Sequence, residues 1–174
     1  GCLEEGISQE AISYAGMEHL NKLILIYDYN KVTLDGPLSD SSIEDTASRF
    51  IACGWNVLRV KDGNSIDMID QAITKAKTSL DKPTLIIVDT IIGYGAPKQG
   101  TNKVHGSPIG FDDGEKAKDF YKYSYPPFEI PDEVYLTFKS SIYARGTEAF
   151  KKYVKTFEEY RLKYEDEAKY LERT

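Results

Sequence analysis

The stretch Leu23–Pro37, with the sequence LILIYDYNKVTLDGP, decides the fold. Its first residues, from Leu23 to Tyr27, are all apolar or aromatic, and the run has the length of a buried strand. A continuous apolar run, unlike an alternating one, is typical of a strand that is covered on both faces, as strands in parallel sheets are. The stretch therefore predicts an α/β fold whose parallel sheet carries helices on both faces.

Polar residues follow this apolar run directly, in the order Asp28, Tyr29, Asn30 and Lys31. In open α/β sheets, ligands bind beyond the carboxyl ends of the strands. The side-chain oxygen of Asn30 and the backbone carbonyls just beyond it are hard donors that suit Mg²⁺ or Ca²⁺. The same residues also fit an ordinary polar turn that ends in Asp35-Gly36-Pro37. Taken alone, the stretch leaves both interpretations open.

Composition narrows the classes of partner. A chain of 174 residues with 41% hydrophobic and 29% charged residues is typical of a soluble globular domain. No apolar run approaches the roughly 20 residues of a membrane span, and a net charge of −6 without a basic stripe argues against nucleic acid. We therefore expect neither a membrane nor a nucleic acid as partner. Cys2 and Cys53 are too few for a disulfide framework, which favours a cytoplasmic location.

Helix and strand patterns alternate along the chain. Apolar spacing and apolar runs predict helices at 3–20, 43–52 and 66–80 and further strands at 55–60 and 84–88. We expect residues 39–42 to provide the cap of the second helix and Ser65 to cap the third. Strands joined by helices through short loops indicate a right-handed parallel α/β unit. Further helices are predicted at 113–123, 132–143 and 147–172.

The loop from Gly93 to Gly114 holds six glycines and is too long for a simple connection. Long glycine-rich loops in compact domains are usually binding or mobile loops. His105 lies in this loop, and imidazole is well suited to proton transfer or oxyanion donation near neutral pH. The other histidine, His19, lies near the end of the first helix and receives no function. Gly1 precedes that helix, whose N-terminus could hold a phosphate.

Three motifs, in order, carry a family resemblance. The opening Gly1–Gly6 (GCLEEG) is similar to the end of the thiamine-diphosphate motif of transketolases, which begins Gly-Asp-Gly and closes at an Asn, here Asn30. Residues 92–97 (IGYGAP) and 104–110 (VHGSPIG) are similar to two further transketolase signatures. The resemblance implies a thiamine-diphosphate-binding fold of the diphosphate (PP) type over residues 1–124. Residues 125–174 would then be a helical extension leading towards a pyrimidine-binding domain.

The resemblance also implies roles for single residues and for partners. His105 would be catalytic, and the cofactor thiamine diphosphate would contact Gly1, Asn30, Leu34, Ile92 and His105. The metal, Mg²⁺ or Ca²⁺, would be bound by Asn30 and by the carbonyl of Val32. Glu5 would belong to a carboxylate network that couples the two active sites of a homodimer. The implied reaction is the transfer of a two-carbon ketol unit between sugar phosphates in the pentose phosphate pathway.

Some features of the family pattern are absent from the sequence. The metal-binding aspartate would stand just before Gly1, and the pyrimidine-binding domain with its activating glutamate is missing. We therefore expect the chain to be a fragment that is inactive by itself. A related enzyme of the dihydroxyacetone synthase type and a non-catalytic binding or assembly module of the same fold stay open as alternatives. The HG-x-P-x-G loop at 105–110 argues against a deoxyxylulose-phosphate synthase.

Overall fold

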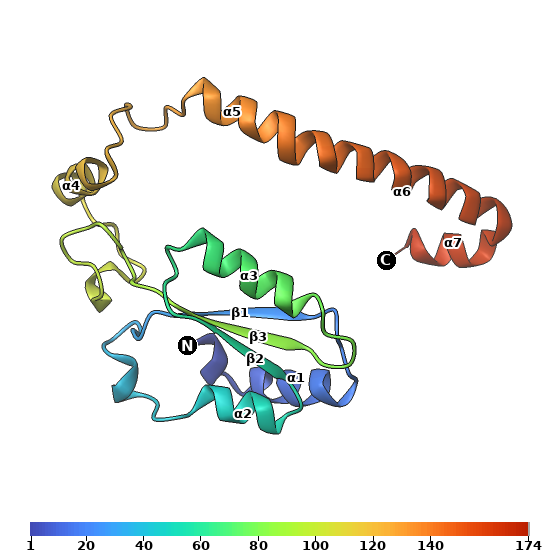
Figure 1. Ribbon diagram of the computed structural model, residues 1–174, viewed down its shortest axis with the longest axis horizontal. Coiled ribbons are helices and arrows are strands. Elements are labelled where there is room, and N and C mark those ends of the chain that lie inside the picture. Colours follow the sequence, from blue (N-terminus) through green and yellow to red (C-terminus); the bar gives the residue numbers. More distant parts are fainter. Residues whose placement is uncertain (174) are drawn as a thin grey trace. The chain divides into compact units, whose positions relative to one another are not determined.

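The computed structural model describes residues 1–173, which form two compact units, Gly1–Tyr123 and the chain from Ser124 onward. Each unit is described by itself. The elements of the first unit (Figure 1) are β1 (Ile24–Tyr29), β2 (Asn56–Val60), β3 (Thr84–Asp89), α1 (Gly6–Met17), α2 (Thr46–Ala52), α3 (Ile66–Ala76) and α4 (Phe111–Tyr121). Short 3-10 helices lie at Cys2–Glu4, Leu38–Asp40 and Asn102–Val104.

The sheet has three parallel strands in the order β1-β3-β2. Thr84, the first residue of β3, pairs with Ile24 on one side and with Asn56 on the other, so all three strands start level. Every β3 residue from Thr84 to Val88 is buried, because this strand has a neighbour on each side and a helix layer on each face. The predicted parallel α/β sheet is confirmed.

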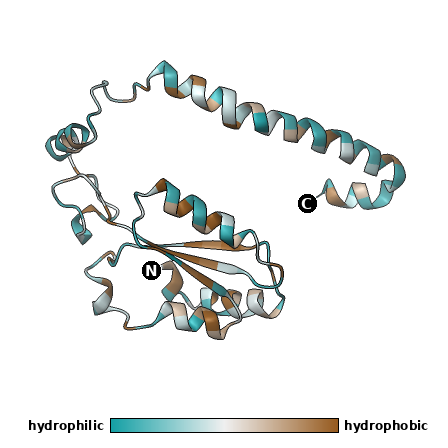
Figure 2. Ribbon diagram, viewed as in Figure 1, coloured by the Kyte–Doolittle hydropathy of each residue, from teal (hydrophilic) through white to brown (hydrophobic). Residues whose placement is uncertain are grey.

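Helices cover both faces of the sheet, as predicted. Figure 1 shows α1 and α2 on one face and α3 on the other, and Figure 2 shows that the strands are among the most hydrophobic segments. On the α1/α2 face, Phe50 and Leu85 are fully buried, and Phe50 meets Trp55 edge to face with ring centroids 5.0 Å apart. On the α3 face, Ala76 packs in one cluster with Val60, Ile86 and Val88.

The first strand and its flanking helices differ from the prediction in detail. β1 continues through Asp28 and Tyr29, because both residues pair in register with β3 despite their polar side chains. β1 is also an edge strand among residues 1–173. Ile26 in this strand is 54% exposed, so β1 is not covered on both faces, contrary to the prediction. The helix predicted at 3–20 is a 3-10 turn followed by α1, which ends at Met17.

The second predicted helix begins later than expected. Asp45, and not a serine of residues 39–42, caps α2, and its carboxylate accepts a hydrogen bond of 3.1 Å from the backbone N–H of Ser48. Residues 38–40 form a separate 3-10 helix instead. The predicted cap of α3 is confirmed, since Ser65 accepts from the N–H of Met68. α3 ends at Ala76, four residues before its predicted end at 80.

The second unit is helical. α5 (Asp132–Phe138), a π-helical turn (Lys139–Tyr143) and α6 (Ala144–Lys163) follow without interruption, and α7 (Glu165–Leu171) comes after Tyr164. The break predicted between residues 143 and 147 is wrong, because a single glycine, Gly146, costs a helix only about 1 kcal/mol. The chain turns instead at Tyr164, which leaves the helical region at φ −134° and ψ 69°. Among residues 1–173, no helix is both long and apolar enough to cross a membrane.

Candidate functional site at the carboxyl edge of the sheet

All three strands end at the same edge of the sheet, because they are parallel. An open pocket of about 360 Å³ lies at this edge. It is lined by residues that follow each strand, namely Asn30, Lys31 and Val32 after β1, Lys61, Asp62 and Asn64 after β2, and Asp89, Thr90 and Ile91 at the end of β3, together with Gly100. The sheet therefore places Asn30 and Val32 at the edge where ligands of α/β proteins bind.

Asn30 is held at the start of a tight loop. Its side-chain Oδ1 accepts a hydrogen bond of 3.1 Å from the backbone N–H of Val32. Lys31, between them, has a positive φ of 62°, and its carbonyl accepts from the N–H of Leu38 at 2.9 Å. The loop thus returns to the end of β1, which fixes the positions of the Asn30 side chain and the Val32 backbone.

The oxygen atoms of this loop fit a hard cation. The Val32 carbonyl accepts none of the hydrogen bonds found among residues 1–173, and Asn30 Oδ1 retains a second lone pair. No group of three or more His, Cys, Asp or Glu side chains in this part of the chain could hold a metal ion. The loop itself would offer a cation the amide oxygen of Asn30 and the carbonyl of Val32, and Mg²⁺ usually completes its coordination with waters and phosphate oxygens.

The glycine-rich loop packs against the segment that follows β3. Gly93 and Gly95 have φ angles of 64° and 85°, which side chains with a Cβ rarely adopt. A Cβ added to Gly93 would lie 2.8 Å from Cγ2 of Val104, and one added to Gly95 would lie 2.7 Å from the ring of Phe120. These contacts give the two glycines of the IGYG segment a steric reason, since Gly93 leaves room for Val104 and Gly95 leaves room for Phe120 of α4.

His105 follows Val104, the residue that lies against Gly93. The imidazole is half-buried, and its Nδ1 is buried without a hydrogen-bond partner among residues 1–173. Asn102, at the start of the same 3-10 helix, donates from Nδ2 to the carbonyl of Asp35 at 2.9 Å. The His105 loop is thereby tied to the loop that carries Leu34. A buried polar atom without a partner calls for an explanation, and a bound ligand supplies one.

The remaining predicted site residues are more dispersed. Gly1 lines a different pocket, of about 380 Å³, on the side of the 3-10 helix at residues 2–4, and Lys31 lines both pockets. Leu34, at 64% exposure, and the half-buried Ile92 line neither pocket. Glu5 is exposed and forms the N-cap of α1 without a side-chain hydrogen bond.

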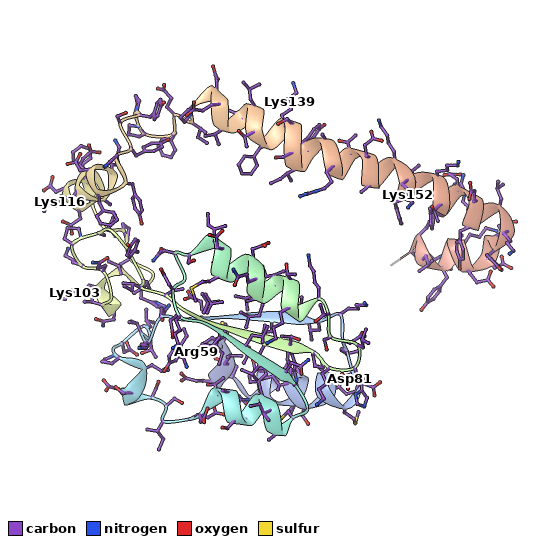
Figure 3. All side chains as sticks on the ribbon, viewed as in Figure 1. Arg59, Asp81, Lys103, Lys116, Lys139 and Lys152 are labelled. Atoms are coloured by element: carbon purple, nitrogen blue, oxygen red, sulfur yellow. The ribbon has the colours of Figure 1, made fainter. Side chains whose placement is uncertain are left out.

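His19 Nδ1 lies 2.9 Å from the carbonyl of Asp81. Figure 3 shows Asp81 and Arg59 towards opposite ends of the sheet, so this contact is at the edge away from the candidate site.

Asp28 and Thr90 form a side-chain hydrogen bond at the carboxyl edge that the sequence reasoning did not anticipate. Each is a polar residue at or just beyond the end of a strand, but no local pattern pairs the two.

An ion pair joins the carboxyl ends of β2 and β3. Arg59 binds Asp89 with both Nε and Nη2, at 3.1 and 2.6 Å, and its guanidinium lies 5.3 Å from the ring centroid of Tyr29 on β1. Arg59, on β2, therefore contacts groups from both of the other strands. Its hydrogen bonds are the main reason why the pKa of Asp89 lies below the ordinary value of an aspartate.

Replacement of Asp89 by Asn is expected to remove a small, pH-dependent part of the stability. Because the pKa of Asp89 is lowered in the folded state, its contribution is present above about pH 4 and is lost as the pH falls through the folded-state pKa. Arg59 is 48% exposed, so the contribution is at most about 1 kcal/mol. Urea unfolding should show a difference between wild type and Asp89→Asn that shrinks as the pH falls below 4.

The matched control is Asp81→Asn, at the opposite end of the sheet. The Asp81 carboxylate makes none of the ion pairs found among residues 1–173, so its replacement should show no such trend. A difference between wild type and Asp89→Asn that is the same at every pH would contradict the assignment.

Comparison with known proteins identifies relatives of the chain. The chain is 46% identical over 164 residues to a transketolase of Streptococcus pyogenes, which covers 94% of this chain and 22% of the relative. It is 47% identical over 168 residues to transketolase 1 of Saccharomyces cerevisiae, covering 94% of this chain and 24% of the relative. The chain thus spans about a quarter of the length of these relatives.

A solved structure agrees with this assignment. The transketolase of Pichia stipitis in complex with sedoheptulose-7-phosphate has a TM-score of 0.88 and 36% identity, over 99% of this chain and 26% of that protein. The family model described as the thiamine diphosphate binding domain of transketolase matches residues 1–174. The chain therefore belongs to the transketolase family, as a representative of its thiamine diphosphate binding domain.

Proposed function

We propose that this chain is the diphosphate-binding part of a transketolase that transfers a two-carbon ketol unit from a ketose phosphate to an aldose phosphate. The observation that carries the proposal is the position of Asn30 at the carboxyl end of β1, in a chain that matches the family domain over its whole length. The full-length protein, below, means the longer polypeptide of which we propose that this chain is a part. In it, residues 1–124 bind the diphosphate and residues 125–174 lead to a pyrimidine-binding domain.

The metal and the cofactor would be held at the carboxyl edge of the sheet. Asn30 Oδ1 and the Val32 carbonyl are the proposed protein ligands of Mg²⁺, with Ca²⁺ as an alternative that the same oxygens admit. The backbone of Gly1 would contact the diphosphate, at a position where an added Cβ would meet no atom of residues 3–173 within 4 Å. Leu34 and Ile92 would supply apolar contacts to the rings. Thiamine diphosphate, once bound, supplies the carbon nucleophile that cleaves and forms the C–C bond.

His105 is the proposed proton-handling residue. Its buried Nδ1 has no partner among residues 1–173, so a hydrogen bond to a bound phosphate or sugar hydroxyl would satisfy it. An imidazole can donate or accept a proton near neutral pH, which suits both binding of an anion and protonation of a substrate oxygen. The Pichia stipitis relative was solved with sedoheptulose-7-phosphate, which supports sugar phosphates as the substrate class.

Membership of the family also supports proposals for the oligomeric state, the pathway and the location of the full-length protein. The full-length protein would act as a homodimer, with Glu5 in a carboxylate network between the two active sites. Glu5 is exposed and makes no capping hydrogen bond, so its carboxylate is available for such a contact. The reaction would serve the pentose phosphate pathway in the cytoplasm. By itself, the 174-residue chain is expected to be inactive.

Replacement of Asn30 by Ala in the full-length protein should weaken metal-dependent cofactor binding. The Mg²⁺ concentration needed for half-maximal binding of thiamine diphosphate should rise by more than about tenfold, since loss of a group that merely orients a metal ligand already costs roughly 10- to 100-fold. Calorimetric titration of the cofactor at a series of Mg²⁺ concentrations measures this change. Asn64→Ala is the matched control, because Asn64 lines the same pocket and has no proposed role. Equal effects of the two variants would refute the metal assignment.

A further inference from the structure

We infer that Thr90 and Asp28 are positioning residues that set the orientation of the Asn30 side-chain amide. The inference rests on the proposed function, since its consequence is the affinity of the carboxyl-edge site for Mg²⁺. It concerns residues that do not touch the metal in the proposal and that act through Asn30. A series of contacts leads from the turn after β2 to the loop after β1.

The series begins with a close approach of backbone to side chain. Gly63, in the turn after β2, donates its N–H to the carbonyl of Asp89 at 2.8 Å. A Cβ added to Gly63 would lie 2.6 Å from Cγ2 of Thr90 and 3.2 Å from Cγ1 of Val88. The backbone of Gly63 thus lies against the methyl group of Thr90. This contact holds the methyl group of Thr90 against Gly63. The hydroxyl, on the same Cβ, therefore points away from Gly63.

The Thr90 hydroxyl donates to Oδ1 of Asp28 on the neighbouring strand. Asp28 pairs in register with Val88, and Thr90 is two residues further along, so the side chains of Asp28 and Thr90 project from the same face of the sheet. The other carboxylate oxygen, Oδ2, accepts from Nδ2 of Asn30 at 3.5 Å. The carboxylate of Asp28 therefore connects Thr90 to Asn30.

Two different partners define the orientation of the Asn30 amide. The carboxylate of Asp28 can only accept, so it pairs with the NH₂ group, and the backbone N–H of Val32 can only donate, so it pairs with Oδ1. An amide turned by 180° would place its oxygen against a carboxylate and its NH₂ against an N–H group. The contacts at both ends therefore favour one orientation, in which the oxygen lies next to Val32, the other proposed source of a metal ligand.

Loss of these contacts should lower the metal affinity without a change in the ligands. Groups that orient metal ligands typically contribute 10- to 100-fold to affinity. Asp28 is exposed to solvent, which weakens its hydrogen bonds, so we expect the lower end of this range, about tenfold. Thr90→Val keeps the shape of the side chain and removes the hydroxyl. Asp28→Asn replaces an acceptor by an amide that can present either of its two ends to Asn30.

The test uses the full-length protein and calorimetric titration of thiamine diphosphate at a series of MgCl₂ concentrations. Thr90→Val and Asp28→Asn should each raise the half-maximal Mg²⁺ concentration about tenfold. Thr90→Ser, which retains the hydroxyl, should restore a value within about twofold of wild type. Thermal unfolding of the cofactor-free variants, which a purely structural role would change, should give midpoints close to that of wild type.

The outcomes separate this inference from the proposed function. One outcome is that Asn30→Ala raises the half-maximal Mg²⁺ concentration while both Thr90→Val and Asp28→Asn leave it unchanged. In that case the positioning role is wrong and the metal site stands. If Asn30→Ala has no effect either, the proposed metal site fails and the inference fails with it. A Thr90→Ser variant as weak as Thr90→Val would also overturn the inference, because the hydroxyl would then not be the group that matters.

Discussion

Replacing Gly16 with alanine should destabilise the 174-residue chain by about 3 kcal/mol, at the upper end of the usual range for overpacked sites. Gly16 lies in α1, where that helix meets the end of α2, and an added Cβ would lie 1.7 Å from the carbonyl oxygen of Cys53. A backbone atom cannot rotate away as a side chain can, so the two helices would have to separate. For a chain of this length, the loss corresponds to a decrease of roughly 10 °C in the unfolding midpoint.

The direction of this stability change distinguishes Gly16 from a glycine in an exposed helix. In an exposed helix, a change from glycine to alanine normally stabilises by up to about 1 kcal/mol. Gly6→Ala in the same helix is the matched control, because a Cβ there would meet nothing within 4 Å. It should leave the stability unchanged or slightly raised.

Trp55 is a suitable probe for both variants, as it is the only tryptophan of the chain and its Nε1 donates to the Ile12 carbonyl at 2.9 Å. Fluorescence-detected unfolding with equal midpoints for Gly16→Ala and Gly6→Ala would contradict the packing of α1 against the end of α2.

Replacing His105 with asparagine should reduce the turnover of the full-length protein about 10²- to 10⁴-fold, the usual contribution of a proton-transferring side chain. Folding should change little, because His105 Nδ1 makes no hydrogen bond to residues 1–173 that the replacement could break. The loop should also keep its shape, since it is held by the contact between Gly93 and Val104 and by the bond from Asn102 to Asp35. Steady-state kinetics together with thermal unfolding separates the two effects.

The chain offers a matched control for this substitution. His19 is the only other histidine, and it lies at the edge of the sheet away from the candidate site. Asparagine tolerates its positive φ of 52°, so His19→Asn should fold and should turn over substrate at the wild-type rate. Turnover by His105→Asn that matches that of His19→Asn would remove His105 from the proposed chemistry.

The sheet was predictable because apolar runs mark β3 and the start of β1, and Thr84–Val88 is the clearest example. The end of β1 was less predictable, because Asp28 and Tyr29 are polar and only their pairing with β3 makes them part of the strand. The cap of α2 could not be chosen from the sequence, since Ser39 and Asp45 are both good caps. In the structure Asp45 is the cap, and the helix that it starts places Phe50 in the core.

The candidate site, like the fold, was predictable from the sequence only in part. The position of Asn30 at the carboxyl edge was predictable, because it is polar and follows an apolar strand, and the long loop that carries His105 was predictable from its glycines. The link from Thr90 through Asp28 to Asn30 was not, since Thr90 and Asp28 are 62 residues apart and meet only because β1 and β3 are neighbours. The order of the strands depends on packing of the whole unit, which a local pattern does not encode.

The most direct test of the account is calorimetric titration of thiamine diphosphate into the full-length protein, with Mg²⁺ and with the metal removed by a chelator, for wild type and Asn30→Ala. We expect tight binding by wild type that depends on Mg²⁺, and much weaker binding by Asn30→Ala at the same Mg²⁺ concentration. Binding that is absent from wild type, or that is equal with and without the metal, would contradict the claim that the carboxyl edge of this sheet holds the cofactor through a metal ion.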